Sequence, residues 1–197
     1  MNRKICGVIL ILFLVFPIGA YAGAPFDTIR THVDSMLDVL RDPALKGESA
    51  RETRKDKIRA ISEKMFNFEA LSKRTLGKNW KKLNAGQQKE FVELYKDMLE
   101  KAYIDRILDY SDEKVVYQKE IMLSENKAEV RTTIVAKTGD IPMNYRLILK
   151  AGKWGVYDIV VEGVSLIKNY RSQFREIIAK KSPEDLLATM REKVGKG

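Results

Sequence analysis

The sequence predicts an α+β fold, in which a curved antiparallel sheet of about four strands carries helices packed on one face. This prediction depends on two changes in the spacing of apolar residues. They recur every three or four positions up to about residue 110, alternate from about residue 114 to 161, and return to the helical spacing after residue 163. A block of strands between two groups of helices is typical of domains whose helices segregate to one side of an antiparallel sheet.

The first segment of the chain has the layout of a secretory signal peptide. Arg3 and Lys4 precede an apolar run from residue 5 to 16, and an A-x-A cleavage site ends at Ala22. The alternative is an uncleaved membrane anchor, for which the run is short, because a spanning helix needs about 20 apolar residues. We therefore expect residues 1–22 to be removed on export and residues 23–197 to form a single domain outside the cytoplasm.

Two helices and an apolar segment are predicted to follow. Asp27 is a candidate N-cap of a first helix that ends near Arg41. A strongly charged second helix is expected from about residue 49 to 65, with a thin apolar stripe. A dense apolar segment from Phe66 to Leu76 comes next.

The central helix has the clearest pattern in the chain. Asn84 and Gln87 form an N-x-x-Q capping arrangement at its start. The spacing alone leaves open whether a given residue of its apolar face belongs to the core or to a binding surface. That face is wide and rich in rings and methionine, with Phe91, Leu94, Tyr95, Met98, Leu99, Ala102, Tyr103 and Ile107.

Four strands joined by short turns are expected at about residues 114–122, 127–137, 141–150 and 154–161. The second strand has its apolar residues at even positions and the third at odd positions, with a turn at 138–140 between them. Alternation of this kind predicts an antiparallel meander with one dry face and one wet face.

Helices are expected again after the sheet. The first begins after Gly163, and the last begins at Ser182, with Pro183 at its first position and Asp185 three residues after the cap. The apolar face of the first of these two helices comprises Val164, Ile167, Tyr170, Phe174, Ile177 and Ile178.

The composition argues against catalysis and nucleic-acid binding. The net charge is +9, but the cations are spread along helices and are not gathered in runs with stacking aromatic residues. The single cysteine, Cys6, lies in the predicted signal peptide, and the single histidine, His32, lies in a polar helical stretch. We expect no catalytic residue, no metal site, no cofactor and no nucleic-acid partner. An enzyme on a cone-shaped α+β scaffold is the alternative, and it lacks an evident catalytic pair.

The residue types that face inward suggest an apolar cleft between the sheet and the helices. Methionine adapts to irregular volumes, and tyrosine combines an apolar ring with a polar tip. The sequence leaves open whether this interior packs solid or forms a cleft. Such a cleft would hold a lipid or another apolar ligand, and replacing Val130 by Trp is expected to lower the amount bound and leave the fold intact. Alternation and helical spacing select as candidate lipid-binding residues Phe91, Leu94, Met98, Tyr103, Val130, Thr132, Ile134, Met143, Tyr145, Leu147, Tyr157, Ile159, Ile167, Tyr170 and Phe174.

Four segments carry a family resemblance. They read W-G-V-Y-D-I-V-V-E-G-V-S-L at 154–166, N-Y-R-S-Q-F at 169–174, L-G-K-N-W at 76–80, and F-x-x-x-Y-x-x-x-L-x-x-x-Y at 91–103. Their order and spacing resemble those of the MlaC family, also called toluene-tolerance proteins. The first segment is specific, whereas the helical patterns are weak by themselves.

The resemblance implies a periplasmic phospholipid carrier that is not an enzyme. Members of that family hold acyl chains between sheet and helices and leave the head group near the mouth. The implied partners are an inner-membrane ABC transporter with an MCE subunit and an outer-membrane lipoprotein complex, within a system that maintains lipid asymmetry. A carrier of another apolar lipid, such as a hopanoid, and a structural envelope protein with a filled core are the alternatives.

Overall fold

The computed structural model describes residues 23–109, 113–137 and 139–196. The predicted signal peptide therefore lies outside the described residues, as does Thr138 of the predicted turn. The elements before the sheet are α1 (Ala24–Arg41), η1 (Pro43–Leu45), η2 (Glu48–Ala50), α2 (Arg51–Met65), α3 (Phe68–Leu76), η3 (Gly77–Lys82) and α4 (Ala85–Leu108). The others are β1 (Lys114–Ser124), β2 (Lys127–Ala136), β3 (Gly139–Lys150), β4 (Lys153–Val161), β5 (Val164–Ser165), α5 (Leu166–Lys180) and α6 (Pro183–Val194).

The sheet is a five-stranded antiparallel meander in the order β1-β2-β3-β4-β5, which confirms the predicted class and connectivity. The short strand β5 was not predicted, because its residues also fit the helical spacing that follows. Glu162 and Gly163 both have positive φ and reverse the chain tightly, so that Val164 pairs with Val161. Ser165 then ends the strand and caps α5 by accepting a hydrogen bond from the Lys168 N–H.

Local capping chemistry fixes the starts of two helices as predicted. The Asn84 side chain accepts a hydrogen bond from the Gln87 N–H, and the Gln87 side chain accepts one from the Asn84 N–H. Ser182 and Asp185 form the same reciprocal arrangement at α6. The first helix differs from the prediction, because α1 begins at Ala24, before Asp27.

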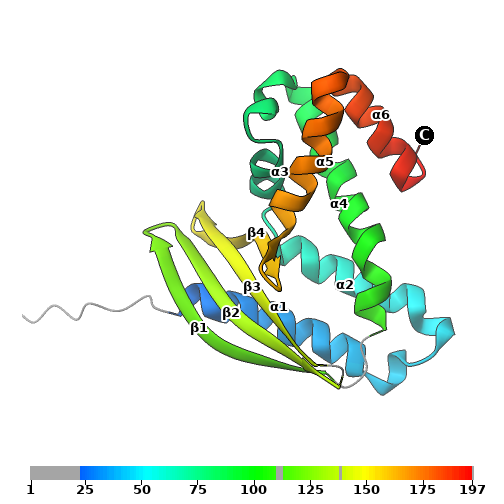
Figure 1. Cartoon of the computed structure of the whole chain (residues 1–197). Helices are drawn as coiled ribbons and strands as arrows, with labels where there is room; N and C mark the ends of the chain where they lie inside the picture. The colour runs from blue at the N-terminus through cyan, green and yellow to red at the C-terminus, as the bar shows by residue number, and fades with distance from the viewer. Residues whose placement is uncertain (1–22, 110–112, 138, 197) are drawn as a thin grey trace, which may run out of the picture.

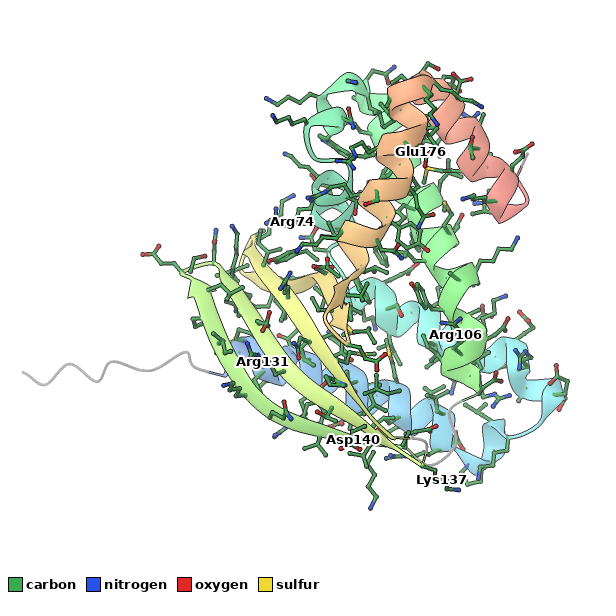
Figure 2. The ribbon with its side chains drawn as sticks, viewed as in Figure 1. Arg74, Arg106, Arg131, Lys137, Asp140 and Glu176 are labelled. Atoms are coloured by element: carbon green, nitrogen blue, oxygen red, sulfur yellow. The ribbon has the colours of Figure 1, made fainter. Side chains whose placement is uncertain are left out.

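Helices α1 and α2 and the end of α4 lie on the inner side of the curved sheet (Figure 1). Helices α3, α5 and α6 and the beginning of α4 gather beyond the β4 side of the sheet. The sheet is anchored to α1, because the Glu120 carboxylate of β1 accepts a hydrogen bond from the Phe26 N–H in the first turn of that helix. Charged side chains cover the outer surfaces, with Arg131 on the sheet and Lys137 and Asp140 at the β2–β3 end (Figure 2).

The apolar interior consists of distinct clusters. One lies among α3, α4, α5 and α6 and is dominated by rings such as Phe91, Tyr95 and Phe174. A second lies between α1 and the sheet, where Ile29 and Val33 pack with strand residues. A third joins Leu40 of α1 and Ile58 of α2 to the end of α4. Within the described residues, no helix is long and apolar enough to cross a membrane.

Candidate functional site

A cavity of about 730 Å³ lies between the inner face of the sheet and helices α1, α2 and α4. Its size falls within the range of about 300–1,000 Å³ that is typical of small-molecule sites. The strand residues on its wall are Val115, Ile134, Ala136, Ile141, Met143, Tyr145, Ile159, Val161 and Val164. The apolar helical and connecting residues on its wall are Val33, Met36, Leu37, Leu40, Ile58, Met65, Phe66, Phe68, Leu99, Tyr103, Ile104, Ile107 and Leu166.

The inner face of the sheet is packed tightly over only part of its length. Under α1, Val130 and Leu147 are completely buried. Further along the same two strands, Ile134 and Met143 remain partly exposed and line the cavity. The interior is therefore solid at one end of the sheet and open at the other.

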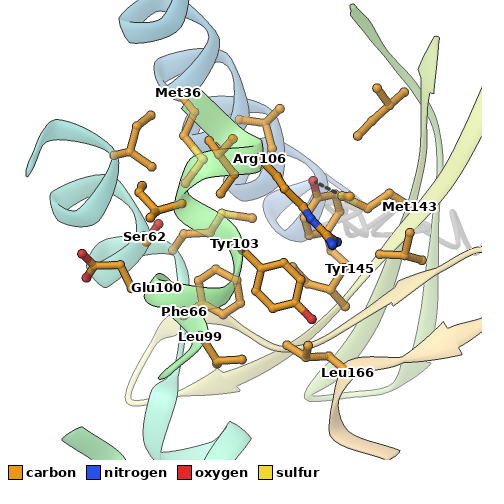
Figure 3. Close-up of a pocket in the computed structure, with 18 of the residues that line it drawn as sticks. Met36, Ser62, Phe66, Leu99, Glu100, Tyr103, Arg106, Met143, Tyr145 and Leu166 are labelled. Atoms are coloured by element: carbon orange, nitrogen blue, oxygen red, sulfur yellow. Dashed lines mark hydrogen bonds between the residues drawn. The ribbon is translucent and has the colours of Figure 1, made fainter. Parts of the chain in front are cut away.

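The Tyr145 hydroxyl at the floor of the cavity is satisfied by a neighbouring side chain. The Tyr145 O–H donates a hydrogen bond to the Met143 sulfur at 3.1 Å, drawn as a dashed line in Figure 3. Burial raises the pKa of Tyr145, so the phenol stays protonated and neutral. A neutral, internally bonded floor favours an apolar occupant, since it offers a ligand no competing polar group.

Charges at the helical rim are mostly paired. The Arg59 guanidinium donates hydrogen bonds to the Glu100 carboxylate at 2.8 and 2.5 Å and to Asp56 at 2.8 Å. Lys96 forms an ion pair with Glu63. These pairs join α2 to α4 across one side of the cavity.

The Arg59–Glu100 pair leads to a prediction about pH. The hydrogen bonds from Arg59 lower the pKa of Glu100, which means that folding stabilises its charged form. This stability is present above the ordinary glutamate pKa of about 4.3 and is lost as the pH falls through the lowered value. We expect Glu100→Gln to lower the melting temperature by about 2–4 °C at pH 7, since a half-exposed pair contributes about 1 kcal/mol.

Melting curves of both proteins between pH 7 and pH 3 measure this effect. The difference from the original protein is expected to shrink in acid. Glu93→Gln is the matched control, because Glu93 is an exposed carboxylate on the same helix. A difference that stays constant down to pH 3 would contradict the assignment.

Five of the predicted lipid-binding residues line the cavity: Tyr103, Ile134, Met143, Tyr145 and Ile159. The others do not. Phe91, Leu94, Met98, Tyr170 and Phe174 belong to the helical cluster, where the Phe91 and Phe174 ring centroids are 5.4 Å apart.

The remaining strand and helix candidates are also placed elsewhere. Val130 and Leu147 lie under α1, and Ile167 is buried at the start of α5. Thr132 is buried and donates its O–H to the Met143 carbonyl at 2.7 Å. The expectation that Val130→Trp leaves the fold intact therefore needs correction, because Val130 has no open space beside it.

Tyr157 departs from the predicted face because β4 is irregular. Arg146 pairs with Asp158, but the next residue, Leu147, pairs with Val156, so Tyr157 is skipped. Its ring faces α3 instead, with the Arg74 guanidinium carbon 4.4 Å from the ring centroid. A one-residue shift of this kind reverses the faces of a strand, and strict alternation cannot reveal it.

Sequence reasoning missed the wall contributed by α1 and α2. Residues such as Val33, Leu37 and Ile58 belong to the apolar stripes of those helices, and their spacing was recognisable. The residues against which these stripes pack could not be predicted, because the apolar stripe of a helix does not indicate which part of a sheet it contacts.

A buried ionic network lies on the opposite face of the sheet. Glu129, Arg146 and Asp158 are cross-strand neighbours on β2, β3 and β4, and both carboxylates are buried. The Arg146 guanidinium bonds Glu129 at 3.2 Å and Asp158 at 3.3 Å. Asp158 also accepts hydrogen bonds from the Ser165 hydroxyl at 2.8 Å and the Ile167 N–H at 3.1 Å. The network thus ties β4 to the start of α5.

Two characterised proteins are similar to this chain in sequence. The Haemophilus influenzae intermembrane phospholipid transport system binding protein MlaC is 27% identical over 131 residues, which span 64% of this chain and 61% of that protein. The toluene tolerance protein ttg2D of Pseudomonas putida is 22% identical over 171 residues, which span 85% of this chain and 80% of that protein.

A solved structure shares the fold. The phospholipid-binding protein from Ralstonia solanacearum, determined in complex with a phospholipid, superposes with a TM-score of 0.75 at 22% identity, over 86% of this chain and 96% of that one. The family model described as MlaC protein matches residues 30–192, which include every residue that lines the cavity. This chain belongs to the MlaC family.

Proposed function

We propose that this protein is a periplasmic phospholipid-binding carrier that takes lipid between the two membranes of the envelope. The observation that carries the proposal is the cavity of about 730 Å³ with mostly apolar walls, in a chain of the MlaC family. The relatives named for phospholipid transport and the neighbour bound to a phospholipid support the same ligand class.

The physics of lipid transfer explains why such a cavity is useful. Each methylene that leaves water gains about 0.8 kcal/mol, so a 16-carbon chain costs on the order of 10 kcal/mol to expose. A carrier must therefore offer walls as apolar as the membrane interior. The floor of Ile134, Met143 and Ile159, opposite Leu99 and the other helical residues, fits that requirement.

The name of the Haemophilus influenzae relative, the binding protein of an intermembrane phospholipid transport system, supports a role with membrane partners, and the family resemblance suggests which ones. We propose delivery to an inner-membrane ABC transporter with an MCE subunit and exchange with an outer-membrane lipoprotein complex. We also propose that binding involves no bond-making step. The comparisons favour phospholipid, and none of them names the hopanoid alternative.

Native mass spectrometry of the protein exported by a Gram-negative host tests the proposal. We expect the chain mass of residues 23–197, together with a bound species that fragments to a phosphorylated glycerolipid. The chain mass tests removal of the signal peptide, and the bound mass tests the ligand. A lipid-free protein, or a bound lipid without phosphate, would contradict phospholipid carriage.

A further inference from the structure

Helix α4 presents one face to the cavity over its second half. Leu99, Tyr103 and Arg106 lie at successive spacings of four and three, so they share that face, and all three line the cavity. Along this face the side chains are apolar at Leu99, aromatic at Tyr103 and cationic at Arg106, in the last turn of the helix. Figure 3 shows the Arg106 side chain extended from α4 towards the sheet, on the side of Tyr145.

Arg106 differs from the other cations of the wall in forming no salt bridge among the described residues. Among the described residues three basic side chains line the cavity, and Arg59 and Lys96 are engaged by Glu100 and Glu63. The acidic neighbour of Arg106, Asp105, does not line the cavity and is paired with Arg51 at 2.6 Å.

We propose that Arg106 binds the phosphodiester of a phospholipid whose acyl chains occupy the cavity, an inference that rests on the proposed function. A lipid with its chains against the apolar wall must place its phosphate beside a charged part of the lining, and among the described residues Arg106 is the lining cation that no carboxylate engages. The guanidinium offers a planar fork of donors that matches two phosphate oxygens, and its methylene stem can lie along the apolar wall.

The acidic residues near Arg106 determine which lipid is the best probe of its role. Asp109 and Glu113 also line this end of the cavity and reduce the positive potential there. A zwitterionic head group avoids their repulsion while still presenting a phosphodiester to Arg106. Phosphatidylethanolamine is therefore compared with diacylglycerol of identical chains, which has the same apolar part and no phosphate.

The experiment loads the protein from mixed micelles that contain equal amounts of the two lipids, and native mass spectrometry gives the ratio bound. The original protein is expected to prefer phosphatidylethanolamine. Arg106→Gln is expected to lower that preference about three- to tenfold, since a charge-assisted hydrogen bond is lost at an exposed position. Arg106→Lys is expected to keep part of the preference.

Two controls distinguish phosphate binding by Arg106 from a general effect of its charge and from stabilisation of the helix C-terminus. Lys89→Gln removes the same charge from an exposed position of α4 away from the cavity, and its ratio is expected to match that of the original protein. A role limited to stabilising the helix C-terminus would lower the melting temperature of Arg106→Gln without changing the ratio, and that result would overturn the proposal.

The two proposals fail in different ways. If the original protein takes up neither lipid, the proposed function itself is wrong. If it takes up both and Arg106→Gln leaves the ratio unchanged, only the role of Arg106 is wrong. Glycerophosphoethanolamine, the head group without chains, is added as a soluble competitor and is expected to have no effect. Competition at millimolar concentration would indicate a free-anion site and overturn the lipid assignment.

Discussion

The Ile134→Trp protein is expected to fold normally and to lose most of its bound phospholipid, whereas the Val130→Trp protein is expected to lose stability. Both residues point to the inner face of β2, four positions apart. Ile134 lines the cavity and is partly exposed, while Val130 has 0% of its surface exposed beneath α1. The same substitution therefore meets open space at one position and a packed core at the other.

The sizes of the two effects follow from that difference. An indole ring in the cavity displaces at least two to three methylenes of acyl chain, or about 2 kcal/mol, which lowers affinity more than tenfold. Overpacking a full core costs up to about 3 kcal/mol, which lowers the melting temperature by about 6–12 °C in a domain of this size.

Native mass spectrometry for retained lipid and a thermal melt for stability measure the pair. Ile134→Trp is expected to melt within about 3 °C of the original protein, since about 1 kcal/mol of strain or less is expected. Full lipid occupancy in a folded Ile134→Trp protein would mean that acyl chains do not use this cavity.

The Asp158→Ala protein is expected to be the least stable of the single variants on the outer face of the sheet. Asp158 has 2% of its surface exposed and holds Arg146, the Ser165 hydroxyl and the Ile167 N–H. Its removal leaves these donors without an acceptor and Arg146 with half of its counter-charge. Breaking such a pair costs about 3 kcal/mol after allowance for the partly exposed arginine, or about 6–12 °C in melting temperature.

Two further variants serve as a control and as a partial rescue for Asp158→Ala. Asp140→Ala removes an exposed carboxylate from the end of the same sheet (Figure 2) and is expected to change the melting temperature by less than about 2 °C. Asp158→Asn keeps an acceptor for Ser165 and is expected to recover part of the loss. Equal melting temperatures for Asp158→Ala and Asp140→Ala would show that the network contributes little.

Lipid binding is also expected to weaken in the Asp158→Ala protein, because the ionic network holds the start of α5 in place. Leu166 and Asn169 in the first turns of that helix lie on the cavity wall. Lipid retained by Asp158→Ala at a temperature where it is still folded is therefore expected to fall. The segment W-G-V-Y-D-I-V-V-E-G-V-S-L, recognised as specific in the sequence, contains both the carboxylate and the serine that make this joint.

Local rules explain the parts of the fold that were predicted from sequence. The reciprocal caps at Asn84 and Ser182 depend on side chains three residues apart, so a short window of sequence contains all the atoms involved. Strands β2 and β3 alternate without interruption through ten paired positions, which is why their dry face was correct.

The candidate site was predicted only where local pattern and tertiary placement coincide. Ile134, Met143 and Tyr145 were selected by alternation, and the open half of the sheet happens to include them. Phe91 and Phe174 were selected by equally good helical spacing, yet they pack on each other among α3–α6. A stripe of apolar residues predicts that a helix face is buried, but it does not indicate which element covers that face.

The sequence by itself determined the class of the fold, the order of its strands, the helix caps and the family to which the chain belongs. Tertiary structure alone decided where the interior is empty. Whether Val130 or Ile134 borders a cavity depends on where helices pack directly against the sheet and where they leave space. Those positions result from packing between residues far apart in the chain, and the bulge at Tyr157 shows that one skipped residue can redirect a side chain from the cavity to α3.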